Sequence, residues 1–143
     1  MEIEEQRAIK EECERLVIAL VHHSDHGEDE AAVDLFSADA TWIRGSKPFT
    51  GRDQLLESFA ARSETAVTRH LTSNIRIMVT DENNAAGVSY YMALRHDPET
   101  GDAALPLPMN PPFSMGEYHD KFVRTSAGWR ISHRVIKRVF QRA

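Results

Sequence analysis

Hydrophobic and polar residues alternate along residues 66–79, AVTRHLTSNIRIMV. This period of two is typical of a β-strand, in which successive side chains point to opposite faces. One face would carry a mainly apolar set: Leu71, Ser73, Ile75, Ile77 and Val79. The other face would carry His70, Thr72, Asn74, Arg76 and Met78. Because buried polar groups need partners, we expect the polar face to look into a cavity rather than into a packed core.

A helical period marks residues 3–25, where apolar residues recur on one stripe: Ile9, Cys13, Leu16, Val17, Leu20 and Val21. Asp25 lies four residues after Val21 and therefore continues the buried stripe, which is an unusual position for a carboxylate. We expect a second, short helix over residues 28–36. A third would begin at Thr50 or Gly51 and run to Arg62, with Asp53 and Thr50 at the spacing of a capping box.

Further strands are predicted over residues 40–45, 85–96, 114–124 and 129–140. Residues 97–112 are too rich in proline for regular structure and predict a loop. Helices first and long antiparallel strands afterwards indicate an α+β fold rather than an alternating α/β fold. We expect a single domain, residues 1–143, in which a curved sheet wraps around a helical layer and leaves a partly polar pocket.

Composition narrows the possible functions. A formal charge of −5 over 143 residues argues against nucleic-acid binding, which favours a basic face. No apolar run reaches the roughly 20 residues that span a bilayer, and the acidic start differs from a signal peptide. The single cysteine, Cys13, cannot form an internal disulfide, so we expect a cytoplasmic protein with a buried, inert thiol. The sequence contains no GxGxxG, Walker or GxSxG motif, and we expect no cofactor.

Asp25 and His70 are the first candidates for chemistry. A carboxylate that accepts one ring N–H of a histidine fixes the tautomer and makes the other nitrogen a better base. That base could remove a proton and later return it to a leaving hydroxyl. The alternative is a structural hydrogen bond that fastens the helix to the sheet.

A second grouping, His22, His23, Asp25 and His26, invites comparison with a metal site. His22 and His26 are four residues apart and would share one helical face, but the adjacent His22 and His23 should point apart. The sequence has no HExxH motif, and histidines at a helix C-terminus also interact favourably with the helix dipole. We therefore expect no metal.

Six segments occur in an order that resembles a known family: HHSDHGED around Asp25, ADATW at residues 38–42, Gly51-Arg52, TRHLTSN at 68–74, GEYHDKF at 116–122 and GWRISHR at 128–134. Together they resemble the SnoaL-like branch of the nuclear-transport-factor-2-like superfamily, which includes scytalone dehydratase, bile acid dehydratase and hexachlorocyclohexane dehydrochlorinase. The resemblance implies a cone-shaped, curved, mostly antiparallel sheet closed by three N-terminal helices (a cystatin-like fold), often dimeric or trimeric.

The resemblance also implies roles for individual residues. Asp25 and His70 match a catalytic dyad, and Arg134 matches an arginine that stabilises a departing anion. The alternative for Arg134 is a surface cation. His96 lies near a second histidine of scytalone dehydratase, with an exposed strand-end histidine as the alternative. Ser24 and Leu20 stand where some relatives carry a catalytic tyrosine or lysine.

Two functions follow as expectations. The first is a cofactor-independent lyase or isomerase, acting by elimination of water or halide on a small, largely apolar cyclic molecule. Its substrate-binding residues would be Trp42, Tyr118, His96, Phe49 and Phe113. The second is a non-catalytic ligand-binding or assembly module that resembles the small subunit of ring-hydroxylating dioxygenases. For either we expect a homo-oligomer, a dimer or trimer, that binds neither nucleic acid nor a membrane.

Overall fold

The computed structural model describes residues 1–101 and 104–142. It contains three helices and six strands in this order: α1 (Ile3–Asp25), α2 (Asp29–Val33), β1 (Phe36–Arg44), β2 (Lys47–Thr50), α3 (Arg52–Ala60), β3 (Val67–Asp81), β4 (Asn84–His96), β5 (Ser114–Thr125) and β6 (Gly128–Gln141). The α+β prediction is therefore confirmed.

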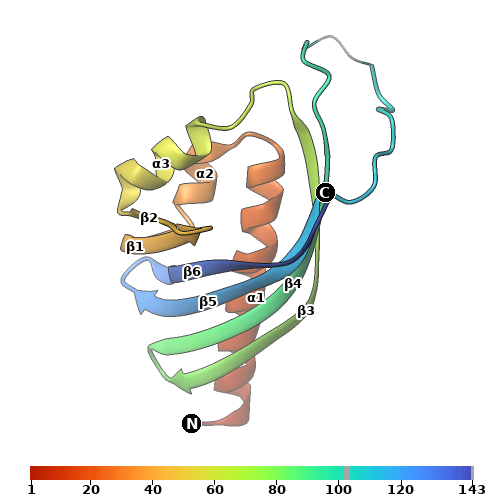
Figure 1. Ribbon diagram of the computed structural model, residues 1–143. Coiled ribbons are helices and arrows are strands. Elements are labelled where there is room, and N and C mark those ends of the chain that lie inside the picture. The colour runs from red at the N-terminus through yellow and green to blue at the C-terminus, as the bar shows by residue number, and fades with distance from the viewer. Residues whose placement is uncertain (102–103, 143) are drawn as a thin grey trace.

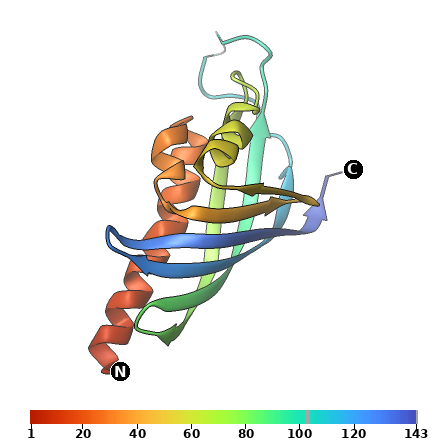
Figure 2. The same cartoon turned by 90° about the vertical axis from the view of Figure 1, so that its left-hand side faces the viewer.

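The strands form one curved sheet in the order β2-β1-β6-β5-β4-β3. All neighbours pair antiparallel except β1 and β6, which are parallel. Figures 1 and 2 show α1 lying along one face of this sheet, with α2 and α3 near the end that carries β1 and β2. The helices therefore cover the inner face, and the outer face of the sheet carries no helix of the described chain.

The main core lies between α1 and the inner face of the sheet. The predicted stripe of α1 is buried throughout, and it packs against side chains from every long strand, among them Ile77, Phe122 and Ile131. Cys13 is fully buried in this cluster, and burial raises the pKa of its thiol to about 12. The thiol is therefore an inert part of the core, as expected.

A β-bulge in β3 corrects the predicted alternation. Ser73 pairs with Tyr90 and Arg76 with Val88, so β3 holds one extra residue there, and Asn74 adopts a positive φ of 52°. A bulge shifts the side-chain parity of the strand beyond it. As a result His70 lies on the same, inner face as Ile77, whereas Leu71 is 55% exposed on the outer face. The expectation that Leu71 shares a face with Ile77 was wrong.

Element ends differ in smaller ways. The strand at 40–45 begins earlier, at Phe36, and β2 was not anticipated. The second helix ends at Val33. The capping box is wrong, because the Thr50 amide donates to Oε1 of Gln54 at 2.8 Å rather than to Asp53. The described part of residues 97–112 has no helix or strand, as expected. No helix among the described residues is long and apolar enough to cross a membrane.

Candidate active site

A cavity of about 860 Å³ opens between the C-terminal end of α1, α3 and the inner face of the sheet. Its walls are aromatic and aliphatic in part, from Trp42, Phe59, Tyr91, Tyr118 and Ile136. Polar and charged side chains from α1, β1, β3 and β6 complete the lining. A concave site of this size with a few convergent polar groups is typical of a small-molecule pocket.

Asp25 and His70 meet in this cavity. The His70 Nδ1 and Asp25 Oδ1 atoms are 2.6 Å apart, and the His70 backbone N–H donates to Asp25 Oδ2 at 2.9 Å. The hydroxyl of Thr68 also donates to Asp25 Oδ1, at 2.9 Å. The side chain of Asp25 is 6% exposed and that of His70 21%. The carboxylate thus fixes Nδ1 as the protonated nitrogen and leaves Nε2 available to a ligand.

These contacts set the charge of Asp25. Burial by itself would raise the pKa of the carboxyl group, but the hydrogen bonds from the His70 side chain and backbone and from Thr68 lower it. The net pKa lies below the ordinary value of 3.8. Asp25 is therefore a carboxylate at neutral pH and can stabilise a protonated His70 during proton transfer.

A second pair of an aspartate and a basic side chain includes Arg134, which lines the same cavity. Arg134 donates from Nε and Nη2 to the two oxygens of Asp120, at 2.7 and 2.9 Å, and both side chains are 1% exposed. Burial would lower the pKa of Arg134, but the charge and hydrogen bonds of Asp120 raise it. Arg134 is thus not the surface cation considered as an alternative. Its Nη1 has no acceptor among residues 1–101 and 104–142 and remains free for a ligand.

Two aromatic side chains, Tyr91 and Tyr118, connect the two pairs. Tyr91 and Tyr118 stack with centroids 4.7 Å apart, His70 lies 6.4 Å from Tyr91, and the Arg134 guanidinium lies 3.9 Å above Tyr118. Trp42 is 6% exposed, and its Nε1 has no hydrogen-bond partner in the described chain. An unpaired buried donor on a cavity wall is suited to binding a ligand acceptor.

Of the other predicted ligand contacts, one lines the cavity and two do not. Phe113 lines the cavity together with Trp42 and Tyr118. Phe49 does not, because it lies on β2 and packs against the hydrophobic core. His96 does not line it either: its Nδ1 lies 3.1 Å from the amide nitrogen of Asn110 beside the loop. Phe49 and His96 therefore lie outside the cavity lining, and a substrate contact for either stays a prediction.

Thr68, Arg44 and Arg138 are among the cavity residues that sequence reasoning missed. Thr68 shares the parity of His70 on β3, and that spacing could have identified it as a second contact of Asp25. Arg44 and Arg138 line the cavity from β1 and β6. No motif marks them, because the pairing of their two strands brings them together.

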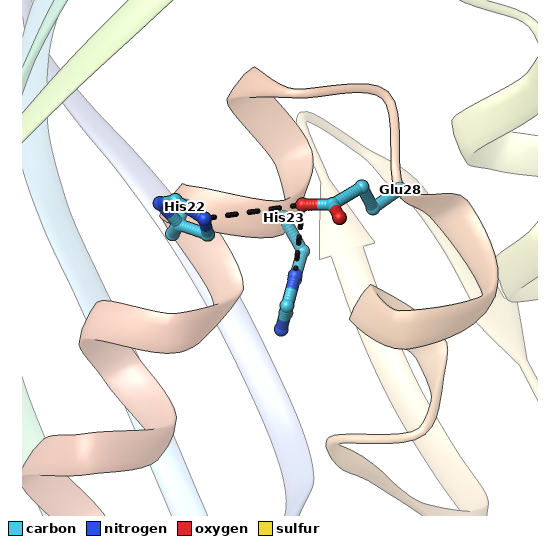
Figure 3. Close-up of side chains that lie close together, drawn as sticks. All are labelled: His22, His23 and Glu28. Atoms are coloured by element: carbon cyan, nitrogen blue, oxygen red, sulfur yellow. Dashed lines mark hydrogen bonds and ion pairs between the residues drawn. The ribbon is translucent and has the colours of Figure 1, made fainter.

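Near the end of α1, nitrogen atoms of His22 and His23 and a carboxylate oxygen of Glu28 lie within 4.8 Å of one another (Figure 3). His23 Nδ1 is 3.2 Å and His22 Nε2 3.9 Å from Glu28 Oε1. Our argument that the two histidines point apart was therefore wrong at the level of their ring nitrogens. The hydrogen bond from His23 lowers the pKa of Glu28 and accounts for the arrangement. The absence of a metal stays a prediction.

Comparison with known proteins identifies a family and several structures that this chain resembles. Residues 5–135 match the family model described as SnoaL-like domain, and no curated protein matches the chain. A protein from Novosphingobium aromaticivorans DSM 12444, provisionally assigned as a scytalone dehydratase, has a TM-score of 0.80 and 21% identity over 99% of this chain and 91% of that one. Hexachlorocyclohexane dehydrochlorinase LinA-type3 from Novosphingobium barchaimii LL02 has a TM-score of 0.79 and 14% identity, over 96% of this chain and 91% of that one. An NTF2-like protein with a cystatin-like fold from Novosphingobium aromaticivorans has a TM-score of 0.74 and 18% identity, over 93% of this chain and 83% of that one. At these identities the likeness shows the fold.

Proposed function

This chain belongs to the SnoaL-like domain family, and from that premise we propose that it is a cofactor-independent lyase or isomerase acting on a small, largely apolar cyclic molecule. Elimination of water or halide is the reaction that we favour. The observation that carries the proposal is the 2.6 Å contact between Asp25 Oδ1 and His70 Nδ1 at the wall of the cavity. Two of the structurally similar proteins are described as a dehydratase and a dehydrochlorinase.

In this mechanism His70 Nε2 removes a proton from a carbon next to an activating group. The C–H electron pair forms the new double bond, and the leaving group departs with its own bonding pair. A departing hydroxide takes the proton back from His70 and leaves as water, whereas halide leaves as the anion and His70 then releases its proton to solvent. Asp25 stabilises the imidazolium between these steps. Proton transfer by a positioned base contributes about 10²- to 10⁴-fold to the rate.

Two donors could stabilise the negative charge that develops. Arg134 Nη1 and Trp42 Nε1 both belong to cavity-lining residues and have no protein partner in the described chain. Because Asp120 neutralises Arg134, the guanidinium acts as an oriented hydrogen-bond donor rather than as a free positive charge. Fixed donors in a site with little water stabilise developing charge without having to reorganise.

The test uses a minimal elimination substrate, 3-hydroxycyclohexanone, whose dehydration to 2-cyclohexenone is followed by ultraviolet absorbance. 3-Cyclohexenone in the same assay tests the isomerase version. We expect the wild-type protein to accelerate one of these reactions, and both His70→Gln and Asp25→Asn to lose about 10²-fold or more of that rate. Thr80→Val, an exposed change on the same strand, should keep it.

Wild-type rates equal to the buffer rate with both probes, or variant rates equal to the wild type, would count against an enzyme. The rival is then the binding or assembly module.

The outer face of the sheet supports self-association in either case. Cross-strand pairing places four apolar residues in one row: Leu71 opposite Met92, Met92 opposite Met115, and Met115 opposite Phe140. Leu71 is 55% and Phe140 66% exposed. We propose that this row contributes to a dimer or trimer of the chain. Light scattering of Leu71→Asp and of Phe140→Asp should then report a smaller assembly than the wild type.

A further inference from the structure

Six arginines line the cavity although the chain as a whole carries a formal charge of −5: Arg44, Arg62, Arg69, Arg95, Arg134 and Arg138. Three of them already have acidic partners. Arg134 binds Asp120, Arg62 lies 3.2 Å from Asp29, and Arg95 lies 3.7 Å from Asp97. Each of these three positive charges is therefore balanced by an aspartate of the protein itself. Arg69 has no acidic partner in the described chain, but it is exposed and donates to the backbone carbonyl of Thr68 at 2.7 Å. Arg44 and Arg138 remain.

Arg44 ends β1 on the inner face, two residues beyond Trp42, and is half-buried. Its guanidinium makes one hydrogen bond, from Nη1 to the Ser58 carbonyl at 3.4 Å, and lies 5.0 Å from the centre of the Trp42 ring. No carboxylate lies within 4.0 Å of it among residues 1–101 and 104–142. A guanidinium has five N–H donors, so most of its capacity is unused.

Arg138 approaches the same region from β6. It follows Arg134 and Ile136 at the two-residue spacing of one strand face, and all three line the cavity. It also has no acidic partner in the described chain. Burial lowers the pKa of Arg44, and the positive charges of Arg62 and Arg138 lower it further. Partly desolvated like charges repel one another, and an anion would relieve that repulsion.

We propose that Arg44 and Arg138 form a subsite for an anionic oxyacid group of the ligand, a carboxylate or a phosphate ester. The apolar body of the same ligand would then lie deeper, against Trp42, Tyr91 and Tyr118. A planar guanidinium binds either oxyacid in a bidentate manner, and a second positive charge strengthens the attraction. The subsite refines the substrate class of the proposed function, but its binding step does not depend on His70.

A structural role for Arg44 is the competing explanation. The guanidinium contacts the last turn of α3 through the Ser58 carbonyl, a favourable position for a cation. That bond is long for a hydrogen bond, however, and uses one donor of five. It also gives no reason for Arg138 to be at the same mouth. A variant series can separate the two roles.

The experiment measures binding by calorimetry with three cyclic probes: cyclohexanecarboxylate, cyclohexyl phosphate and the neutral cyclohexanecarboxamide. We expect at least one anion to bind the wild type about tenfold or more tightly than the amide. Added salt should weaken binding of the anion and leave the amide unchanged. The better of the two anions identifies the oxyacid. Arg44→Gln/Arg138→Gln should lose the preference for the anion while its affinity for the amide stays the same.

Three controls keep the result interpretable. Arg76→Gln removes the same charge from an exposed position of β3 outside the cavity lining and should keep the preference. Arg138→Gln alone changes an exposed side chain, so it should fold normally and reduce the preference by part of the full effect. His70→Gln keeps both arginines and should retain the preference for the anion over the amide, whatever its affinity for the two probes, which separates this subsite from the proton-transfer proposal. Equal binding of anion and amide to the wild type, no binding of either, or a preference that survives in the double variant would overturn the subsite.

Discussion

Two buried pairs of an aspartate with a basic side chain contribute to the cavity wall, and they differ in what they can do. Asp25 contacts His70 through one ring nitrogen, and an imidazole can accept and donate a proton in general acid–base catalysis. Asp120 contacts Arg134 through two parallel hydrogen bonds, and a guanidinium does not lose its proton in proteins. The first pair can gain and release a proton. The second pair fixes charge and geometry.

Their surroundings follow the same division. His70 is 21% exposed on the cavity wall, so a ligand can reach its free nitrogen, whereas Arg134 and Asp120 are each 1% exposed. The tyrosine stack of Tyr91 and Tyr118 lies between the two pairs. The comparison teaches that an Asp–base pair in a pocket is suited to catalysis when its base can titrate and is reachable. A fully paired arginine instead holds the architecture and offers at most one donor.

The largest effect on stability should come from breaking the ion pair between Asp120 and Arg134. Asp120→Asn leaves the Arg134 charge buried without a counter-ion and should lower the free energy of unfolding by about 3–5 kcal/mol. Urea denaturation measures it. Replacing both partners, Asp120→Leu with Arg134→Met, should cost less than Asp120→Asn alone.

An exposed pair supplies the control for that measurement. Arg52 and Asp34 are 2.6 Å apart, with side chains 48% and 63% exposed. Asp34→Asn should change the free energy of unfolding by no more than about 1 kcal/mol. Equal losses for Asp34→Asn and Asp120→Asn would contradict the claim that burial distinguishes the two pairs.

The next largest effect is the loss of stability at low pH through Asp25. The pKa of Asp25 is lowered in the folded protein, so the unfolded chain takes up a proton first as the pH falls. The contribution of Asp25 to stability is therefore fully present well above pH 4, declines below that, and is lost once the pH passes through the folded pKa. Urea midpoints measured from pH 6 to pH 2 should show a steeper decline for the wild type than for Asp25→Asn. Parallel curves would count against this linkage.

A smaller change sharpens the role of Thr68. Thr68→Val removes the hydroxyl that donates to Asp25 Oδ1 and should cost about 0.5–1.5 kcal/mol of unfolding free energy. It should also raise the pKa of Asp25, because that hydrogen bond is one of the contacts that lower it. Titration of the carboxyl group by nuclear magnetic resonance checks the direction. Thr80→Val, on the exposed part of the same strand, should change neither quantity.

The smallest effect concerns the histidine cluster outside the cavity. His22 and Glu28 are at least half-exposed, so we expect equimolar Zn²⁺ to move the melting temperature by less than about 1 °C. Differential scanning calorimetry with and without chelator provides the measurement. A rise of several degrees that disappears in Glu28→Gln would instead assign a zinc site to His22, His23 and Glu28.

Patterns within single elements were readable from the sequence. The stripe of α1, including the position of Asp25 at its inner end, follows from a 3.6-residue period that side chains cannot escape once the helix forms. The parity of β5 was equally readable: Tyr118, Asp120 and Phe122 all face inward. In β4, Tyr91 is buried and Tyr90 is 42% exposed, as neighbours on a strand must diverge.

Relations between elements were decided by the tertiary structure. The bulge at Asn74 reverses the parity of β3, and it is visible only in the register that β3 makes with β4. The partner of Arg134 is a residue of the neighbouring strand, opposite it in the β5–β6 register. Arg44 and Arg138 line the same cavity because β1 pairs with β6. Periodicity is a local property of the chain, whereas register, bulges and charge pairing depend on which strands come to lie side by side.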